Sequence, residues 1–289
     1  MKTLNHFARN VYSQFGEDGI LEVILSKFPE TNCWCVEFGA WDGRLMSNTC
    51  HLIQSKNYRA VLIEADSRKF KELAANYSGN RSVTTVCALV DWQDHKLDDI
   101  LASTEIPRDF DLLCIDVDGN DYHIWAATHL YSPKVVCIEF NPTVATGIEF
   151  VQKAKAGISQ GASITSMVAL GKDKGYELVA ATRNNAIFVA EKYLRLFELV
   201  DNRPEALRID SAWVTQIFWG MDGKLFMAGN ETMPWHGISI RRLIREIPRS
   251  LLGFPVAMPW WKRKAFAAWK KLFRLEAKMR CHRLKPLDR

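Results

Sequence analysis

The chain has 289 residues, of which 48% are hydrophobic and 25% charged, a composition typical of a folded globular protein. No run of about 18 apolar residues occurs, so we expect no transmembrane helix, and residues 1–19 lack the apolar core of a signal peptide. The net charge is +5, but residues 241–289 hold 15 Lys or Arg against 3 Asp or Glu, so a basic tail follows an acidic body.

The cysteines predict a reduced chain. Seven are present, without a C-x-x-C pair or the spacing of a zinc site. Five of them lie in or beside apolar runs, where a free thiol behaves as a small hydrophobic group: Cys33, Cys35, Cys87, Cys114 and Cys137. We therefore expect no disulfide framework and a cytoplasmic location.

Apolar runs bounded by turn residues alternate with helical patterns from residue 17 onward. A helix is predicted at 17–28, a second begins near Ser47 or Asn48, and a third follows residue 66 and ends by Asn80. Strands are predicted at 33–40, 59–66, 83–90, 110–117 and 133–141. Because these runs are almost continuously apolar, we expect parallel strands that are buried on both faces of a sheet.

The pattern changes after these strands. A helix is predicted at 163–175, and two apolar runs within 176–193 are separated by Arg183-Asn184-Asn185. Asn tolerates the left-handed conformation of hairpin turns, so this segment predicts an antiparallel hairpin. Dehydrogenase-type sheets normally continue with parallel strands at this point. Residues 195–289 are expected to be helical or irregular.

The first predicted strand ends in "EFGAWDG", residues 37–43, where Gly39 and Gly43 permit a tight turn into a helix. Backbone N–H groups of such a loop can approach a ligand closely. Glu64, at the end of the next strand, is the type of residue that holds two ribose hydroxyls in nucleoside-binding sheets. Trp41 occupies the place of a middle glycine, which favours an adenosyl ligand without phosphates over a dinucleotide.

These motifs, followed by "FDLLCIDVDGND", "VVCIEFN" and a terminal hairpin, resemble a class I S-adenosylmethionine-dependent methyltransferase. "YSQFGEDGIL", residues 12–21, resembles the FkbM-like methyltransferases, many of which are linked to O-methylation of sugars in glycans and natural products. The resemblance covers residues 12–193. It implies an α/β, Rossmann-like, mostly parallel seven-stranded sheet of order 3-2-1-4-5-7-6 with a terminal antiparallel hairpin. It also implies a methyltransferase domain at 1–195, including an N-terminal helical lid at 1–30.

The resemblance implies S-adenosylmethionine as cofactor. Glu37 and Gly39 are expected to line its methionine part, Glu64 its ribose, and the region of Ala88 and Leu89 its adenine. Gln14 and Glu17 are expected to close the site from the N-terminal side. The full expected set is Gln14, Glu37, Phe38, Gly39, Ala40, Gly43, Glu64, Ala65, Ala88, Leu89 and Asp116.

The stretch "LLCIDVDGNDYHIW", residues 112–125, places several carboxylates directly after an apolar strand. A helix–loop–helix calcium loop is excluded, because its sixth position would be Asp121 and its twelfth Ala127, and because a strand precedes it.

Metal-assisted O-methyltransferases carry a carboxylate after the fourth strand and a carboxylate with an Asn after the fifth. Asp116, Glu139 and Asn141 match those places, although Phe140 separates the last two. They are the expected ligands of Mg²⁺ or Mn²⁺, which would orient sugar hydroxyls and lower the pKa of the attacking one. The alternative is that Asp116 and Asp118 cap the turn and hold substrate hydroxyls.

Methyl transfer also needs a group that takes the proton of the acceptor hydroxyl. His123 is the expected base, with Asp118 and Asp121 as alternatives. A lone His after an acidic loop is often only a structural hydrogen-bonding residue, and that alternative stays open.

A helical C-terminal extension is expected at 196–289, with a basic amphipathic helix at about 259–285. Its tryptophans and basic residues fit an anionic membrane surface, which would place the protein at the inner face of a membrane. Packing on the protein or in a homo-oligomer is the alternative, and nucleic acid is a third partner class that we regard as disfavoured.

The expected acceptor is a sugar hydroxyl in a glycan or glycan precursor, including lipid-linked ones. Three rival functions stay open: methylation of a small natural product, a non-catalytic nucleoside-binding protein, and an NAD-dependent sugar enzyme. The last would need a fuller Gly-x-Gly-x-x-Gly loop and a Tyr-x-x-x-Lys pair on a helix, and neither is in place.

Overall fold

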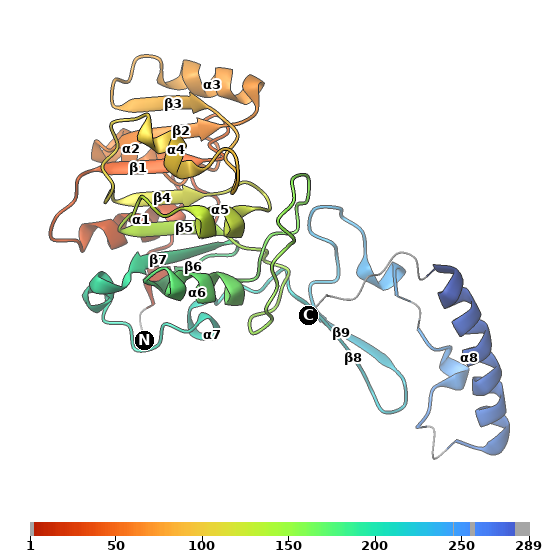
Figure 1. Cartoon of the computed structure of the whole chain (residues 1–289). Helices are drawn as coiled ribbons and strands as arrows, with labels where there is room; N and C mark the ends of the chain where they lie inside the picture. Colours follow the sequence, from red (N-terminus) through yellow and green to blue (C-terminus); the bar gives the residue numbers. More distant parts are fainter. Residues whose placement is uncertain (1–2, 245, 255–257, 281–289) are drawn as a thin grey trace. The chain divides into compact units, whose positions relative to one another are not determined.

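The computed structural model describes residues 3–244, 246–254 and 258–280, with side chains to residue 273. The chain divides into two compact units, unit 1 up to Ala212 and unit 2 from Trp213 (Figure 1). The sequence placed this boundary after residue 195. It lies later because Phe197 and Leu207 are buried in the cores of unit 1.

Unit 1 is built on a seven-stranded sheet of order β3-β2-β1-β4-β5-β7-β6 (Figure 1). Its strands are β1 (Trp34–Phe38), β2 (Arg59–Glu64), β3 (Val83–Cys87), β4 (Leu112–Ile115), β5 (Val135–Glu139), β6 (Tyr176–Ala181) and β7 (Asn185–Ala190). The first five strands pair in parallel, whereas β7 pairs antiparallel with both β5 and β6. The predicted order, the parallel strands and the terminal hairpin are thereby confirmed.

Helices cover both faces of the sheet. The α-helices of unit 1 are α1 (Glu17–Ser26), α2 (Cys50–Lys56), α3 (Ser67–Tyr77), α4 (Leu97–Ala102), α5 (Asp121–Ala127), α6 (Ile164–Asp173) and α7 (Pro204–Leu207). Residues of α1, α2 and α3 share one core cluster, and residues of α4, α5 and α6 share the other. Central strands contribute to both clusters in alternation: in β1, Cys35 belongs to the first and Val36 to the second. Burial on both faces explains their continuous apolar sequences.

Two local predictions need correction. β3 is only half-buried, because it forms an edge of the sheet, so the expectation of burial on both faces is wrong there. α2 begins at Cys50, later than Ser47 or Asn48, because those two residues and Thr49 hydrogen-bond the Glu37 carboxylate. α3 begins where the sequence predicts, with the Asp66 side chain accepting the Arg68 and Lys69 amides.

Short 3-10 helices complete both units: η1 (Leu4–Phe7), η2 (Glu191–Phe197), η3 (Ile240–Arg242) and η4 (Arg249–Leu251).

Unit 2 contains an antiparallel ribbon of β8 (Thr215–Trp219) and β9 (Leu225–Gly229), followed later by α8 (Trp260–Arg280). The expectation of only helical or irregular structure after residue 195 is wrong here, because "TQIFW" is rich in strand-forming side chains and a glycine-containing turn follows it. α8 matches the predicted basic helix, of which residues 281–285 lie outside the described part. Over the described residues, no helix combines the length and apolarity needed to cross a membrane.

Candidate functional site

The loop that follows β1, residues 39–43, lies across the ends of β1 and β2, and we call it the glycine loop. Gly39 has a φ of +75°, and the next two residues bond to β2: the Ala40 amide to the Ile63 carbonyl at 3.1 Å, and the Trp41 amide to Glu64 Oε2 at 2.8 Å. Trp41 is itself left-handed, with a φ of 52°, a conformation that costs energy in a residue other than glycine. The loop is therefore held by its backbone across this edge of the sheet.

Glu64 is buried at the end of β2, and each of its carboxylate oxygens accepts one backbone amide. Oε1 accepts the Asp66 amide at 2.7 Å and Oε2 the Trp41 amide at 2.8 Å. A carboxylate oxygen has two acceptor sites, so one site on each oxygen is left for a ligand hydroxyl. Two amides thus fix the side chain expected to hold a ribose.

Three other expected cofactor residues lie at the ends of β2 and β3. The Ala88 amide donates to the Glu64 carbonyl at 3.2 Å, which places the end of β3 beside Glu64. Ala65 and Leu89 are exposed at this edge. The structure therefore brings the expected ribose and adenine residues together.

Glu37 serves a local purpose that its sequence position did not predict. Its buried carboxylate accepts the hydroxyls of Ser47 and Thr49, at 2.6 and 2.7 Å, and the Asn48 amide at 2.8 Å. Burial raises its pKa, and these hydrogen bonds partly offset the rise. Glu37 therefore shapes the "SNT" turn behind the glycine loop. Phe38 and Ala40 are buried core residues, and the Gly43 carbonyl accepts the Tyr77 hydroxyl at 2.7 Å.

Three carboxylates meet at the ends of β4 and β5. Asp116, Asp118 and Glu139 each offer an oxygen, and these oxygens lie within 4.8 Å of one another. Asp118 is left-handed, with a φ of 55°, and exposed. Two expected metal ligands are thus brought together, and the third member is a residue expected to act in catalysis. We call these three residues the acidic cluster.

The acidic cluster adjoins the glycine loop. The Asp116 amide donates to the Phe38 carbonyl at 3.3 Å, and a Cβ added to Gly39 would lie 1.7 Å from the Asp116 carbonyl oxygen. Only glycine permits the two strand ends to approach this closely. The residues expected to bind the methyl donor and those expected to bind the methyl acceptor are therefore neighbours.

Burial and mutual repulsion disfavour the charged forms of two members of the acidic cluster, Asp116 and Glu139. Burial, followed by repulsion from Asp121 and Asp118, raises the pKa of Asp116 well above its usual range. Burial and repulsion from Asp116 do the same to the pKa of Glu139, whose Oε1 accepts the Asn184 amide group at 3.3 Å. Among the described residues, none forms a hydrogen bond or ion pair with the Asp116 side chain. A hard divalent cation, which prefers oxygen ligands, fits this arrangement.

Asp121 and Asn141 are engaged elsewhere. Asp121 is buried and accepts the amides of Val117 and Gly119 at 2.8 and 2.9 Å, so it closes the turn that carries Asp118. Burial raises its pKa to about 6. The Asn141 side-chain oxygen accepts the amide and hydroxyl of Thr143, and its NH₂ group donates to the Gln160 carbonyl. Both residues therefore organise loops around the acidic cluster.

His123 lies on α5 with one ring nitrogen engaged. Its Nε2 donates to the Gln152 carbonyl oxygen at 2.7 Å, which leaves Nδ1 as the acceptor nitrogen of the neutral ring. Gln152 is buried, and its side chain bonds Asn120, Ile158 and the amides of Gln160 and Gly161. No sequence pattern marked Gln152, because its partners come from loops that only the fold brings together.

The loop between η1 and α1, residues 8–16, is called the N-terminal loop here, and it is tied to the β6–β7 turn by Glu17, which is fully buried. Glu17 accepts the Phe15 amide at 2.8 Å and, through its other oxygen, the Thr182 hydroxyl at 2.6 Å and the Asn185 side chain at 3.1 Å. The neighbouring Asn184 bonds Glu139, so hydrogen-bonded residues lead from this loop to the acidic cluster. Gln14 is exposed on the same loop.

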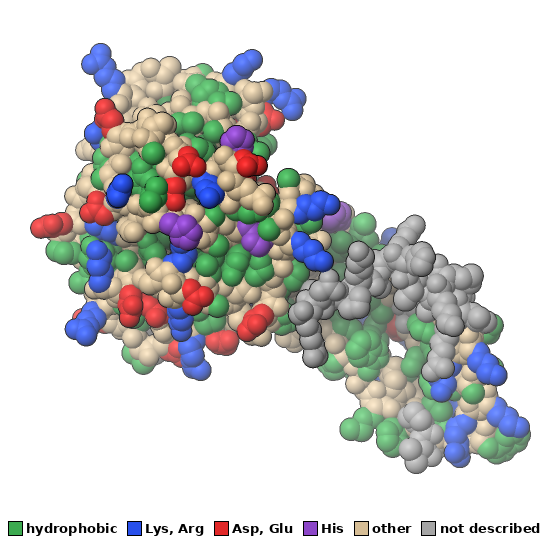
Figure 2. All heavy atoms as spheres, viewed as in Figure 1, with side chains coloured by type: hydrophobic (Ala, Val, Ile, Leu, Met, Phe, Trp, Pro, Cys, Tyr) green, Lys and Arg blue, Asp and Glu red, His purple; other side chains and the backbone are tan. Residues whose placement is uncertain are grey.

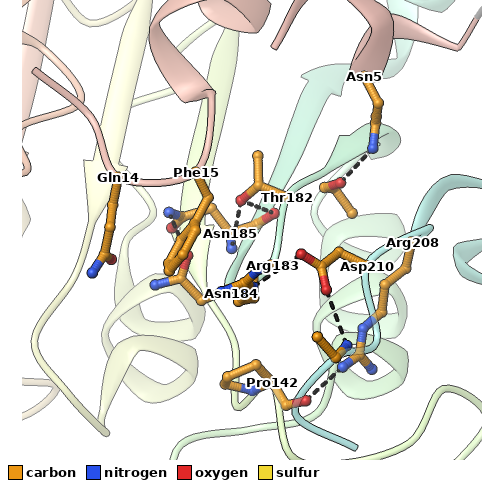
Figure 3. A network of polar contacts seen from close by, with 12 residues as sticks. Asn5, Gln14, Phe15, Pro142, Thr182, Arg183, Asn184, Asn185, Arg208 and Asp210 are labelled. Atoms are coloured by element: carbon orange, nitrogen blue, oxygen red, sulfur yellow. Dashed lines mark hydrogen bonds and ion pairs between the residues drawn. The ribbon is translucent and has the colours of Figure 1, made fainter. Parts of the chain in front are cut away.

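The segment after α7 holds the loop that follows β5. Arg208 is buried, and its guanidinium donates to the carbonyls of Pro142 and Val144, each at 2.7 Å (Figure 3). Asp210 pairs with Arg183 at 2.9 Å, and the Arg183 guanidinium lies 4.7 Å from the centre of the Phe15 ring. The sequence predicted neither contact, because the partners are far apart along the chain.

Comparisons with known proteins give fold-level likenesses only. No protein-family model and no curated protein matches this chain. Among solved structures, the N-terminal domain of EvdMO1 with S-adenosylhomocysteine bound is 11% identical and covers 60% of this chain and 80% of its own, with a TM-score of 0.41. The precorrin-6y C5,15-methyltransferase from Geobacter metallireducens GS-15 is 17% identical over 63% of this chain and 90% of its own, with a TM-score of 0.37. The CMeT domain of the citrinin polyketide synthase is 12% identical over 60% of this chain and 51% of its own, with a TM-score of 0.41.

Proposed function

We propose that the protein is an S-adenosylmethionine-dependent O-methyltransferase that acts, with help from a divalent cation, on a sugar hydroxyl of a glycan or glycan precursor. The observation that carries the proposal is the contact between the glycine loop and the acidic cluster, at the carboxyl edge of the sheet. In doubly wound sheets, ligands bind at this edge. Donor-binding and acceptor-binding groups would then lie side by side, as a transfer reaction requires.

The donor side consists of the loop at Gly39 and the Glu64 carboxylate. Bound S-adenosylmethionine supplies an electrophilic methyl group on a sulfonium. Glu64, held by the Trp41 and Asp66 amides, has acceptor sites left for two ribose hydroxyls. Ala65 and Leu89 are exposed beside it, where an adenine ring needs apolar contacts.

The acceptor side consists of the acidic cluster. Asp116, Asp118 and Glu139 would hold the cation, and Asn184 keeps Glu139 turned by its 3.3 Å hydrogen bond. A divalent cation in this place supplies a Lewis acid that lowers the pKa of a hydroxyl bound to it. Carboxylates are also hydrogen-bond acceptors for neighbouring hydroxyls, which supports a sugar as the acceptor.

In the transfer, the acceptor oxygen forms a bond to the methyl carbon while the carbon–sulfur bond breaks, and S-adenosylhomocysteine leaves. The hydroxyl proton passes to a base of the protein. The two candidates are Asp118, which offers only one of its two oxygens to the acidic cluster, and the Nδ1 atom of His123. Asp121 is disfavoured because it is buried where it closes the turn. The protein otherwise contributes orientation of the two reactants.

The donor side is tested by calorimetry with S-adenosylhomocysteine. We expect binding to the native protein, and binding about tenfold or more weaker in Glu64→Gln, because a hydrogen bond to a charged group contributes about 1.5–3 kcal/mol. Glu30→Gln, at an exposed position, is the matched control and should bind as the native protein does. Absence of binding to the native protein, with or without Mg²⁺, would refute the proposal.

The cation is tested by thermal unfolding. Mn²⁺ or Mg²⁺ should raise the melting temperature, because a ligand that binds only the folded state stabilises it. Glu139→Gln should abolish this rise, whereas Glu149→Gln, which changes an exposed glutamate, should keep it. If EDTA leaves turnover unchanged and Glu139→Gln is fully active, the cation has no part in the reaction.

The acceptor class is tested by a methyl-transfer screen read by mass spectrometry. Nucleotide sugars and lipid-linked glycans form one set, and hydroxylated small natural products form the other. A mass increase of one methyl group on a sugar supports the proposal. Methyl transfer only to members of the second set would support the proposed reaction but show that the acceptor is a small natural product and not a sugar.

A further inference from the structure

We propose that unit 2 binds the surface of an anionic phospholipid bilayer, through the apolar side of α8 and the turn between β8 and β9. This inference does not depend on the proposed methyl transfer. It rests on the distribution of charge and exposed apolar side chains in unit 2.

α8 has two distinct sides. Arg263, Lys264, Lys270 and Lys271 are all exposed and, at 100° per residue, lie within one third of the helix circumference. In Figure 2, blue side chains gather over this helix. By sequence, α8 holds eight Lys or Arg and one Glu. Such a helix attracts a negatively charged surface.

The opposite side of α8 is mainly apolar, with Lys262 as the exception among its described side chains. Phe266, Trp269 and Phe273 are half-buried and stack along the helix, with ring centroids 5.8 and 5.1 Å apart. Beside them runs an exposed apolar stripe of Trp261, Ala265, Ala268 and Leu272, which we call the outer stripe. Trp261 is 58% exposed and Leu272 65% exposed, fractions that a side chain packed in a core would not show.

The turn of the β8–β9 ribbon adds a second exposed apolar group. Trp219 is 65% exposed and Met221, in the turn, 84% exposed. Both faces of the ribbon carry apolar side chains: Phe218 stacks on Phe226 at 5.3 Å on one, and Trp219 lies opposite Leu225 on the other. A two-stranded ribbon this exposed is only marginally stable in water, so burial of its side chains would stabilise it.

Residues 252–253 contact both the β8–β9 turn and the start of α8. The Gly253 amide donates to the Asp222 carbonyl at 2.6 Å, and the Lys262 ammonium donates to the Leu252 carbonyl. The two exposed apolar groups therefore belong to one connected structure within unit 2.

The lipid surface is favoured over other occupants by the pairing of charge and apolarity. An in-plane helix places its apolar side at the boundary of headgroups and acyl chains, and its Lys and Arg reach the anionic headgroups. Trp is enriched at this depth because its ring is amphipathic. Packing of two α8 helices through the outer stripe would cover the apolar side chains but leave the basic side, on the opposite face, without an anionic partner.

The test is flotation of the full chain with vesicles of phosphatidylcholine, alone and mixed with phosphatidylglycerol. We expect binding to the mixed vesicles, weaker binding to the neutral ones, and a decrease at high salt. Trp261→Ser combined with Leu272→Ser should lower the partition coefficient about tenfold or more, since each buried side chain contributes about 1.5–3 kcal/mol. The matched control is Leu130→Ser with Val200→Ser, two exposed apolar positions of unit 1.

Charge is tested by Lys264→Glu with Lys271→Glu, which should weaken binding about tenfold or more. Lys71→Glu with Lys172→Glu changes the net charge equally in unit 1 and should have little effect. Quenching of tryptophan fluorescence by brominated lipids gives a measurement on the native protein, should a variant fail to fold.

Failure of the native protein to bind mixed vesicles would overturn the inference. An equal loss of vesicle binding in the variants and in their controls would overturn it as well. A native dimer that the α8 variants dissociate, with unchanged vesicle binding, would assign the outer stripe to an interface between copies. Binding to a mixed-sequence RNA oligonucleotide in the absence of vesicle binding would assign the basic side to nucleic acid. Either result would also overturn it.

Discussion

Gly39 is the residue at which the donor loop and the acidic cluster meet. Its φ is +75°, and an added Cβ would lie 1.7 Å from the Asp116 carbonyl oxygen. We predict that Gly39→Ala destabilises unit 1 by about 3 kcal/mol or more, because left-handed strain of about 1–3 kcal/mol adds to a clash with backbone. Urea unfolding monitored by circular dichroism measures the change.

Substitutions at two further glycines distinguish the effect of backbone strain from that of the steric clash at Gly39. Gly157 has a φ of +74° with no atom near the position of an added Cβ, so Gly157→Ala should cost about 1 kcal/mol from strain alone. Gly79→Ala meets neither obstacle and should change the stability by less than about 0.5 kcal/mol. Equal stability of all three variants would show that β1 and β4 do not approach as closely as described.

Among single residues, those at strand ends were the most predictable. Asp116, Glu139 and Glu64 were identified because each directly follows or ends an apolar strand, and parallel strands bring such ends together. Asn184 and Gln152 were not, because their roles depend on hydrogen bonds to side chains and loops remote in sequence. Glu37 was identified as a site residue, yet its partners Ser47 and Thr49 were not.

At the scale of elements, the N-terminal loop is organised by Asp18 of α1. One oxygen of this buried carboxylate accepts the amides of Val11, Tyr12 and Ser13, at 2.8, 2.7 and 2.7 Å. We predict that Asp18→Ala destabilises unit 1 by about 2–4 kcal/mol, because one buried and two partly buried amides lose their carboxylate acceptor. Hydrogen exchange should speed up at residues 11–13 before it does in the central strands.

Asp173→Ala is the control for this loop prediction, because Asp173 is exposed on α6. It should leave the exchange of residues 11–13 unchanged. Protected amides in Asp18→Ala would mean that the Glu17 contacts to Thr182 and Asn185 hold the loop without Asp18.

The elements of unit 1 followed the hydrophobic pattern closely, because central strands that are buried on both faces consist almost entirely of apolar residues. The ends of the elements did not follow this pattern, because side-chain hydrogen bonds determine where an element begins. The contacts of Glu37 with residues 47–49 keep them out of α2, which therefore begins at Cys50. In unit 2 the β8–β9 ribbon was missed. Its residues are apolar on both faces without forming a core cluster, so no alternation of apolar and polar residues signalled a strand.

At the scale of the whole molecule, the two units differ in how they are stabilised. Every residue of the two core clusters belongs to unit 1. Unit 2 relies on smaller contacts, such as the Trp213 and Trp235 rings 5.6 Å apart and the aromatic stacks of α8. Stability from apolar burial is therefore concentrated in unit 1.

We predict two separate transitions in scanning calorimetry, a large cooperative one from unit 1 and a weaker one from unit 2. S-adenosylhomocysteine at about 100 times its dissociation constant should stabilise unit 1 by about 2.7 kcal/mol, which raises its transition by about 5–10 °C. The unit 2 transition should not move, because the proposed donor site lies wholly within unit 1. Glu64→Gln should remove the shift, and Trp261→Ser should leave it in place. A single transition that moves as a whole with the ligand would contradict the division into two separately folding units.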